Sequence, residues 1–191
     1  TAQSGECRPF AVFGGSECTL IPAGCTACDH IFDQMLPVET WGNNYFTIPF
    51  TGTSGYTYRV LARDNGTSVS IDGGAPFILN AGQFQEFNGV AIPKHVTSNN
   101  PVSVIQYMQG TACSLSGDPA MLVLNSDDQR ISEVTFSTVS STVITQHVLN
   151  LIVETADVGT VQLDNTAIPA SSYSLFPGVP TRSYAQINLT Q

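Results

Sequence analysis

The stretch Tyr56–Gly74, which reads YTYRVLARDNGTSVSIDGG, decides the fold class of this chain. Apolar and β-branched residues fill Tyr56–Ala62 and Thr67–Ile71, and each run has the length of one strand. The triplets Asp64-Asn65-Gly66 and Asp72-Gly73-Gly74 follow the two runs, with residue types that tolerate positive φ in tight hairpins. The stretch therefore predicts consecutive β-strands joined by tight turns.

Short apolar runs separated by turn residues continue from Tyr45 to the C-terminal region, without a convincing amphipathic helix. Strands at this close spacing predict an all-β fold of the β-sandwich or jelly-roll type. The further runs expected as strands are Phe77–Leu79, Gln83–Phe87, Val90–Val96, Val102–Met108, Ala120–Leu124, Ile131–Val139, His147–Glu154, Thr160–Leu163, Ser172–Phe176 and Arg182–Leu189.

A faint internal repeat suggests how these strands are organised. The segment Val69–Gly73 resembles Val161–Asn165, and Asp164 lies 92 residues after Asp72. The flanking strands follow the same order in both places, which favours a duplication, whereas similar turns in unrelated hairpins would explain the five residues alone. With a duplication, residues 1–44 form a cysteine-rich segment, residues 45–117 a first β subdomain and residues 118–191 a second one that lacks its last strands.

An incomplete second subdomain would expose an apolar face and a row of unpaired backbone groups. A strand from a neighbouring copy could fill the gap by β-strand addition. Repeating such a head-to-tail contact would give a filament, because a heterologous interface that does not close propagates. The candidate donor is the extended N-terminal stretch of Arg8, Pro9, Phe10, Ala11, Val12 and Phe13.

The composition excludes several classes of function. Of the 191 residues, 42% are hydrophobic and 11% are charged, so the chain can bury a core and is not disordered. The net charge is −9 with six Lys and Arg residues, whereas nucleic acids and anionic membranes require clustered basic residues. No run of residues reaches the length of a membrane span.

The cysteines indicate an oxidising, extracellular environment. Four of the five lie in the first 28 residues, in a stretch rich in glycine and proline that suits disulfide bonding. The disulfide candidates are Cys18, Cys25, Cys28 and Cys113. The odd cysteine, for which Cys7 is the candidate, is bonded to another chain or to a part of the protein outside this sequence, or else it is a buried free thiol. Glycosylation sequons at Asn65 and Asn188 agree with a secretory route.

Catalytic and metal-binding patterns are weak. The segment Cys25-Thr26-Ala27-Cys28-Asp29-His30 has zinc-like spacing, but a second Cys/His pair is missing from the sequence and disulfides are the simpler explanation. The same CxxC lacks the βαβ context of a redox motif. None of the three histidines (His30, His95 and His147) accompanies a nucleophile motif. We therefore expect no enzyme and no cofactor, with room only for weakly bound calcium.

Two motifs resemble those of a known family. Cys25–Trp41 reads CTACDHIFDQMLPVETW and is followed by Gly42, and Gly117–Met121 reads GDPAM. Their order closely resembles that of the N-terminal domain family of the IgG Fc-binding proteins, over about Cys18 to the C-terminus. The resemblance implies an extracellular, β-rich module with a structural or adhesive role and no catalytic residues. Its motif residues here are Asp29, His30, Gln34, Trp41, Asp118 and Pro119.

These motif residues also have physical roles that we expect from their types. Trp41, with Tyr45 and Phe46, would anchor the first sheet and use its ring N–H on a backbone acceptor. Asp29 and His30 would tie the N-terminal loop to the sandwich by hydrogen bonds, and the alternative is a ligand or metal contact.

Three hypotheses of function remain. The first is an extracellular structural or adhesive subunit that assembles with copies of itself into filaments. The second is a monomeric secreted module that binds a glycan or protein ligand. The third is a hydrolase or metal protein, which would require His30 within reach of a nucleophile.

Overall fold

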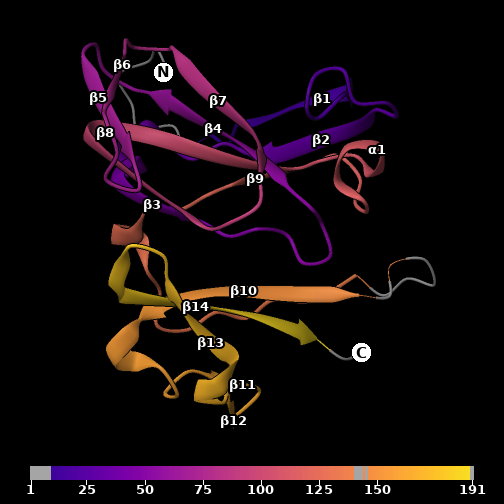
Figure 1. Ribbon diagram of the computed structural model, residues 1–191, viewed down its shortest axis with the longest axis vertical. Helices are drawn as coiled ribbons and strands as arrows, with labels where there is room; N and C mark the ends of the chain where they lie inside the picture. The colour runs from indigo at the N-terminus through magenta and orange to yellow at the C-terminus, as the bar shows by residue number, and fades with distance from the viewer. Residues whose placement is uncertain (1–9, 140–143, 145, 190–191) are drawn as a thin grey trace.

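The computed structural model describes residues 10–139, 144 and 146–189, and the fold is all-β, as the sequence predicts (Figure 1). The strands are β1 (Phe13–Thr19), β2 (Asp29–Gln34), β3 (Gly42–Thr47), β4 (Tyr56–Ala62), β5 (Thr67–Ile71), β6 (Phe77–Leu79), β7 (Phe84–Val90), β8 (Lys94–Met108), β9 (Ala120–Val123), β10 (His147–Glu154), β11 (Gln162–Leu163), β12 (Thr166–Ala167), β13 (Tyr173–Phe176) and β14 (Val179–Leu189).

Helical structure is limited to short turns. These are α1 (Thr111–Ser114) and the 3-10 turns η1 (Val38–Thr40), η2 (Asp127–Gln129), η3 (Thr155–Asp157) and η4 (Ala170–Ser172). Within the described part of the chain, no helix has the length and apolar character needed to cross a membrane.

The largest sheet is organised around β8. The first half of this strand pairs with β3 and β5, and its second half pairs with β4 and β9, all antiparallel. Pro101 lies between the two halves. Because proline has no backbone N–H to donate, it suits the point where β8 changes from one pair of neighbouring strands to the other. Because one strand serves both halves, the seven-stranded sheet curls over a single core.

The core of this curled sheet is aromatic and β-branched. Tyr45 closes one side, where its hydroxyl donates to the Val102 carbonyl at 2.7 Å. The Gln106 amide, which is also buried, donates to the Ile48 carbonyl at 2.6 Å. The buried cluster consists of Tyr45, Tyr56, Tyr58, Val60, Ala62, Val69, Leu79, Val96, Val102 and Val104.

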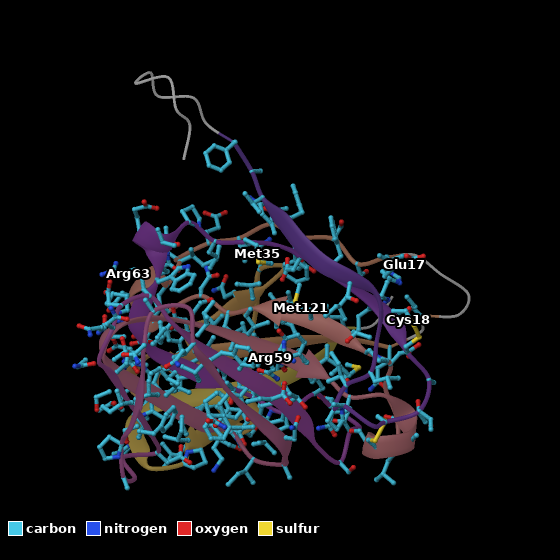
Figure 2. All side chains as sticks on the ribbon, turned by 90° about the horizontal axis from the view of Figure 1, so that it is seen from above. Glu17, Cys18, Met35, Arg59, Arg63 and Met121 are labelled. Carbon is cyan, nitrogen blue, oxygen red and sulfur yellow. A yellow bond between two sulfur atoms is a disulfide. The ribbon has the colours of Figure 1, made fainter. Side chains whose placement is uncertain are left out.

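The other face of β4 carries Arg59, which is labelled in Figure 2 and contacts two rings. Its guanidinium carbon lies 4.9 Å from the ring centre of Phe84 and 5.2 Å from that of Tyr107. Its Nε donates to the Glu86 carboxylate at 2.6 Å. Arg59 therefore connects β4 to its neighbours β7 and β8 on this face of the sheet.

A smaller sheet, with strand order β10-β14-β13, lies below the curled one in Figure 1. Phe46 and Ile48 pack with Phe176 of β13 in a second buried cluster between the sheets. Arg182 of β14 binds the Asp127 carboxylate at 2.7 Å, with both side chains largely buried. These contacts join the two sheets into one body.

Three features differ from the expected strand order. The runs Val90–Val96 and Val102–Met108, expected as two strands, are replaced by the single strand β8 (Lys94–Met108), while Val90 ends β7. Residues 131–139, expected as a strand, form no regular structure although the segment favours strands by composition. The strand β9 lies beyond the predicted subdomain boundary at residue 117, yet it pairs with β8 of the first sheet. The two predicted subdomains are thus linked by a shared strand.

Two disulfides, Cys18–Cys28 and Cys25–Cys113, hold the N-terminal part of the chain, and they confirm the expectation of disulfide bonding. Cys25 is buried, and its partner lies on α1, 88 residues later. This longer bridge connects the cysteine-rich segment to the end of β8.

We expect replacement of both Cys25 and Cys113 by serine to lower the free energy of unfolding by about 4 kcal/mol, because a long loop gains much entropy in the unfolded chain. The matched control replaces Cys18 and Cys28, which close a loop of 10 residues. Its loss should be roughly 2 kcal/mol smaller, as judged by urea denaturation. Equal losses for the two pairs would contradict this account.

His95 gives the fold a dependence on pH. Its ring stacks on Phe46 at 4.7 Å between ring centres and its Nε2 lies 2.6 Å from the Asn44 side-chain oxygen. Burial lowers the pKa of His95 below 6.5, and Arg182 adds to this, against the opposite pull of Asp72 and Asp127. The folded chain therefore binds a proton at His95 less readily than the unfolded chain does.

The contribution of His95 to stability should be complete above pH 6.5 and should decline as the pH falls below that value. His95→Gln removes the titrating group, so the free energy of unfolding of this variant should depend less on pH. Urea denaturation at about pH 7.5 and about pH 5.5 compares the two proteins. The same pH slope in both would refute the assignment.

Candidate binding surface

A two-stranded ribbon, formed by β1 and β2, lies beside the large sheet. Phe13 pairs with Gln34 and Ser16 with Ile31, and the Val12 carbonyl accepts a hydrogen bond from Met35 N–H at 2.8 Å. In Figure 2, Glu17 and Cys18 mark one end of the ribbon and Met35 the other. A hairpin alone is only marginally stable in water, so this ribbon needs additional anchors.

Covalent and polar anchors supply that stability. The disulfide Cys18–Cys28 joins the end of β1 to the residue before β2, and Cys25–Cys113 ties the connecting loop to α1. The Asp33 carboxylate accepts the backbone N–H of Val123, on β9, at 2.9 Å. The ribbon is thus held against the edge of the large sheet.

The outward surface of the ribbon is aromatic. Phe13 and Phe32 stack with 5.5 Å between ring centres and 7° between ring planes, and they remain 54% and 65% exposed. Phe10 and Val12 are also exposed. We call the stacked pair of Phe13 and Phe32 the aromatic face. Large exposed apolar groups in a cluster mark interaction sites on secreted proteins.

Gly15 makes the close pairing within the ribbon possible. It lies opposite Phe32, and a Cβ atom at this position would collide with the Ile31 carbonyl. The Phe13 ring, on the same strand, reaches Phe32. A glycine therefore permits both the strand pairing and the ring stack.

A shallow groove lies between β2 and β9, and two sequence motifs meet there. Its lining residues are Asp29, His30, Ile31, Phe32, Pro119, Ala120 and Met121. Asp29 accepts hydrogen bonds from the His30 backbone N–H at 2.7 Å and pairs with the ring Nδ1 at 2.9 Å. We expected Asp29 and His30 to tie the N-terminal loop to the sandwich by hydrogen bonds. These hydrogen bonds instead join the two residues to each other, and they are neighbours in sequence.

The Asp29 carboxylate of this groove and the neighbouring Asp118 carboxylate influence each other. Hydrogen bonds from His30 lower the pKa of Asp29, against a smaller effect of desolvation. Desolvation raises the pKa of Asp118, and the neighbouring Asp29 carboxylate adds to the increase. Both carboxylates are solvent-exposed. Across the described residues, no three His, Cys, Asp or Glu side chains gather in a way that could hold a metal ion.

The other residues singled out from the sequence have structural surroundings. Trp41 donates its ring N–H to the Leu36 carbonyl at 3.3 Å, and Gln34 lies at the exposed end of β2. Asn65 and Asn188 are exposed, and each side-chain oxygen accepts a hydrogen bond, from Ala81 N–H and from the Gln146 amide respectively. Cys7, Arg8 and Pro9 lie outside the described residues.

Comparison with known proteins places this chain in a family. The family model described as IgGFc binding protein matches residues 2–191. The chain belongs to this family. The match confirms the resemblance seen in the two motifs. No curated protein and no solved structure matches the chain.

The IgGFc-binding family is one of extracellular modules, and its name indicates a binding role. The two disulfides fit an extracellular protein. In this chain, the Gly117–Met121 motif lies beside the ribbon strand that carries Asp29 and His30, and the two disulfides anchor the same ribbon.

Sequence reasoning missed Phe32 and Gly15 as parts of the candidate surface. The signal available was the alternation in Asp29–Gln34, where His30, Phe32 and Gln34 fall on one face of a strand. Gly15 carries no signal of its own, because its role depends on the position of the opposite strand.

We expect Gly15→Ala to disrupt the ribbon, because the added Cβ meets backbone rather than a flexible side chain. The cost should be about 1–3 kcal/mol, as for other overpacked sites. Gly14→Ala is the matched control, since its Cβ would meet only the Met35 side chain, with the sulfur at 3.4 Å. Hydrogen exchange of the Met35 amide reports the pairing, and equal exchange in both variants would contradict the prediction.

Proposed function

We propose that this chain is an extracellular adhesive module that binds protein partners through the aromatic face of its ribbon. The observation that carries the proposal is the stack of Phe13 and Phe32, which stays solvent-exposed on a disulfide-anchored support. Aromatic residues are enriched among the side chains that dominate binding energy at protein interfaces. Because the ribbon is fixed in advance, binding costs little ordering of the surface.

The ribbon also offers a mode of binding through its backbone. In the described part of the chain, β1 pairs only with β2, so its outer edge is open to strand addition. An incoming strand would gain hydrogen bonds from β1 and contacts with the aromatic face. Both features favour an extended polypeptide over a glycan as the ligand.

Other copies of the chain are the partners that we favour. The N-terminal residues Phe10–Phe13 include exposed apolar groups suited to joining neighbours, although Phe13 already pairs with Gln34. One-way repetition of such a contact would build a filament. An intermolecular disulfide through Cys7 would stabilise it. The family name makes immunoglobulin Fc a second candidate partner, to be tested on the same surface.

The proposal includes neither catalysis nor a cofactor. The hydrogen bonds of His30 to Asp29 and of His95 to Asn44 support structural roles for these histidines. N-linked glycans at Asn65 and Asn188 would be compatible with binding through the ribbon, since both residues are exposed and lie away from the ribbon in sequence.

We expect the double variant Phe13→Ser/Phe32→Ser to weaken self-association by on the order of tenfold or more, since each ring resembles an interface hot spot. Light scattering over a range of concentrations measures association, and an immobilised Fc fragment tests the second partner. Ile78→Ser is the control, because Ile78 is 62% exposed on β6, outside the ribbon.

A loss of binding in the ribbon variant alone would support the proposal. Failure of the wild-type chain to bind either copies of itself or Fc would overturn it, as would equal binding by all three proteins. Unchanged circular dichroism establishes that the variants keep the β fold.

A further inference from the structure

One face of the small sheet carries uncharged polar side chains and is directed toward the large sheet. Val148 of β10 lies opposite Asn188 of β14. Two residues further along the strands, Asn150 lies opposite Gln186, on the same face. The Gln186 amide donates to the Asn150 side-chain oxygen at 3.1 Å and to the Pro49 carbonyl at 2.7 Å. Because Pro49 comes directly after the segment that leaves β3, these bonds orient the face toward the large sheet.

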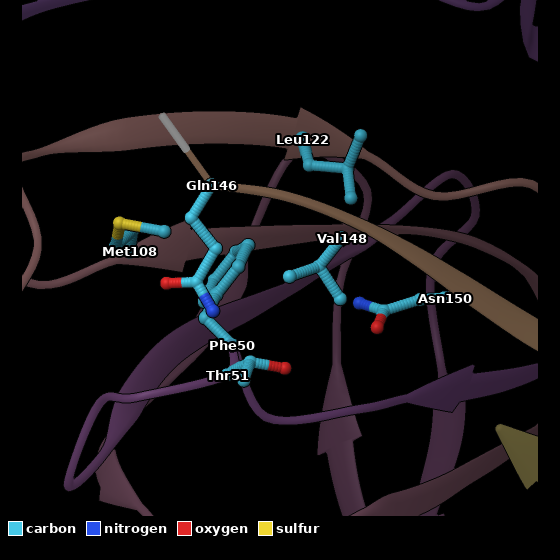
Figure 3. Close-up of a pocket in the computed structure, with 7 residues that line it drawn as sticks. All are labelled: Phe50, Thr51, Met108, Leu122, Gln146, Val148 and Asn150. Carbon is cyan, nitrogen blue, oxygen red and sulfur yellow. The ribbon is translucent and has the colours of Figure 1, made fainter. Parts of the chain in front are cut away.

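A pocket of about 470 Å³ lies between this face and the large sheet (Figure 3). Figure 3 shows the Phe50 ring close to Gln146 and Val148. The size of the pocket lies within the range of sites that enclose small ligands, and such sites combine apolar walls with a few polar groups. The seven described lining residues are all uncharged, and they are Phe50, Thr51, Met108, Leu122, Gln146, Val148 and Asn150. In a chain of net charge −9, this lining suits an uncharged ligand.

The first residue of a glycosylation sequon, Asn188-Leu189-Thr190, lies at the rim of this pocket. Gln146, which lines the pocket, donates its side-chain amide to the Asn188 side-chain oxygen at 3.3 Å. Asn188 itself is exposed. The hydrogen bond uses the amide oxygen of Asn188, whereas an N-linked glycan is attached to the amide nitrogen, Nδ2. A glycan can therefore be joined to Asn188 with this hydrogen bond intact.

The first sugar of an N-linked glycan in animals and other eukaryotes, N-acetylglucosamine, matches the lining of the pocket. Its ring has apolar C–H faces, which pack on an aromatic ring such as Phe50, and its N-acetyl methyl group suits an apolar side chain such as Leu122. Its hydroxyl groups match the Thr51 hydroxyl and the Asn150 amide, which both donate and accept hydrogen bonds. The bond from Gln186 holds the Asn150 amide in place before a ligand binds.

We infer that an N-linked glycan on Asn188 places its first N-acetylglucosamine in this pocket, between the two sheets. The modification transfers an oligosaccharide from a lipid pyrophosphate donor. The bond between sugar C1 and the pyrophosphate oxygen breaks, a bond between C1 and Asn188 Nδ2 forms, the nitrogen loses a proton, and the lipid pyrophosphate leaves. Attachment beside the pocket gives the sugar an effective concentration on the order of millimolar, so even a weak site is filled. The bound sugar covers apolar side chains where the two sheets meet, and this role is separate from binding through the ribbon.

The other sequon provides a comparison within the same molecule. Asn65 is also exposed, and its side-chain oxygen accepts the Ala81 N–H at 3.0 Å between two turns of the large sheet. Neither Asn65 nor Ala81 lines the pocket. A glycan on Asn65 therefore extends into solvent, whereas the first sugar on Asn188 is held against the protein.

Enzymatic release of the two glycans tests the inference on the full chain secreted by eukaryotic cells. An amidase that hydrolyses the bond between asparagine and the first sugar acts on the folded protein, and mass spectrometry of peptides follows each site. Because the enzyme reaches only the unbound sugar, we expect release from Asn188 to be on the order of tenfold slower than from Asn65. After denaturation the two rates should be similar.

A variant that fills the pocket separates this effect from the position of Asn188 on a strand. Leu122→Trp should accelerate release from Asn188 by a similar factor, because the larger side chain takes the place of the sugar. Ile78→Trp is the matched control, since Ile78 is another exposed apolar strand residue and lies outside the pocket. It should leave the release from Asn188 unchanged.

Methionine methyl signals in NMR spectra give a second measurement that does not depend on an enzyme. Of the three methionines, Met108 lines the pocket, whereas Met35 lies beside the ribbon. Thr190→Ala removes the sequon and keeps Asn188, and Thr190→Ser retains the sequon as its control. We expect the Met108 methyl signal of the wild type and of Thr190→Ser to differ from that of Thr190→Ala and to show nuclear Overhauser effects to sugar protons. The Met35 signal should be the same in all three proteins.

Several outcomes would overturn the inference. These are a secreted chain without sugar at Asn188, equal release from Asn188 and Asn65, no acceleration by Leu122→Trp, and a Met108 signal that glycosylation leaves unchanged. If added N-acetylglucosamine shifts the Met108 signal of Thr190→Ala at micromolar concentrations while glycosylation does not, the pocket binds a free sugar instead. The Phe13→Ser/Phe32→Ser variant tests the ribbon independently of all these results.

Discussion

The structure depends on one strand, β8, which provides hydrogen bonds for four neighbours. Because its first half pairs with β3 and β5 and its second half with β4 and β9, the strand must turn from one side of the core to the other. Val96, Val102 and Val104 lie on it and are fully buried. The curl of the sheet, the aromatic core and the position of β9 all follow from this shared strand.

The ribbon follows a different principle from the large sheet. It gains little from burial, since its rings face solvent, and it depends on two disulfides and one side-chain hydrogen bond to β9. In this arrangement the exposed binding surface and the stabilising core are separate, because the core does not need the exposed rings. Secreted domains with small cores commonly use disulfides in this way.

Local sequence could predict the all-β fold, the disulfides and the family, because each has a signal within short windows. The strands β1 and β2 were harder to recognise, since their pairing depends on Gly15 and on contacts distant in sequence. Residues 131–139 show the reverse case, in which strand propensity does not produce a regular strand. The meeting of Asp29 with Asp118 could not be predicted either, because tertiary packing alone brings the two motifs together.

The bridge between Cys25 and Cys113 also determines how the chain would carry mechanical load. Tension applied to an adhesive module from its ribbon would pass through this covalent link directly to α1. The 88-residue span between the two cysteines contains β2 to β8, so pulling on the ends of the chain cannot draw out this part of it. The large sheet apart from β9, which follows Cys113, is thereby shielded from extension, and any lengthening under force is confined to the segments on either side of the bridge.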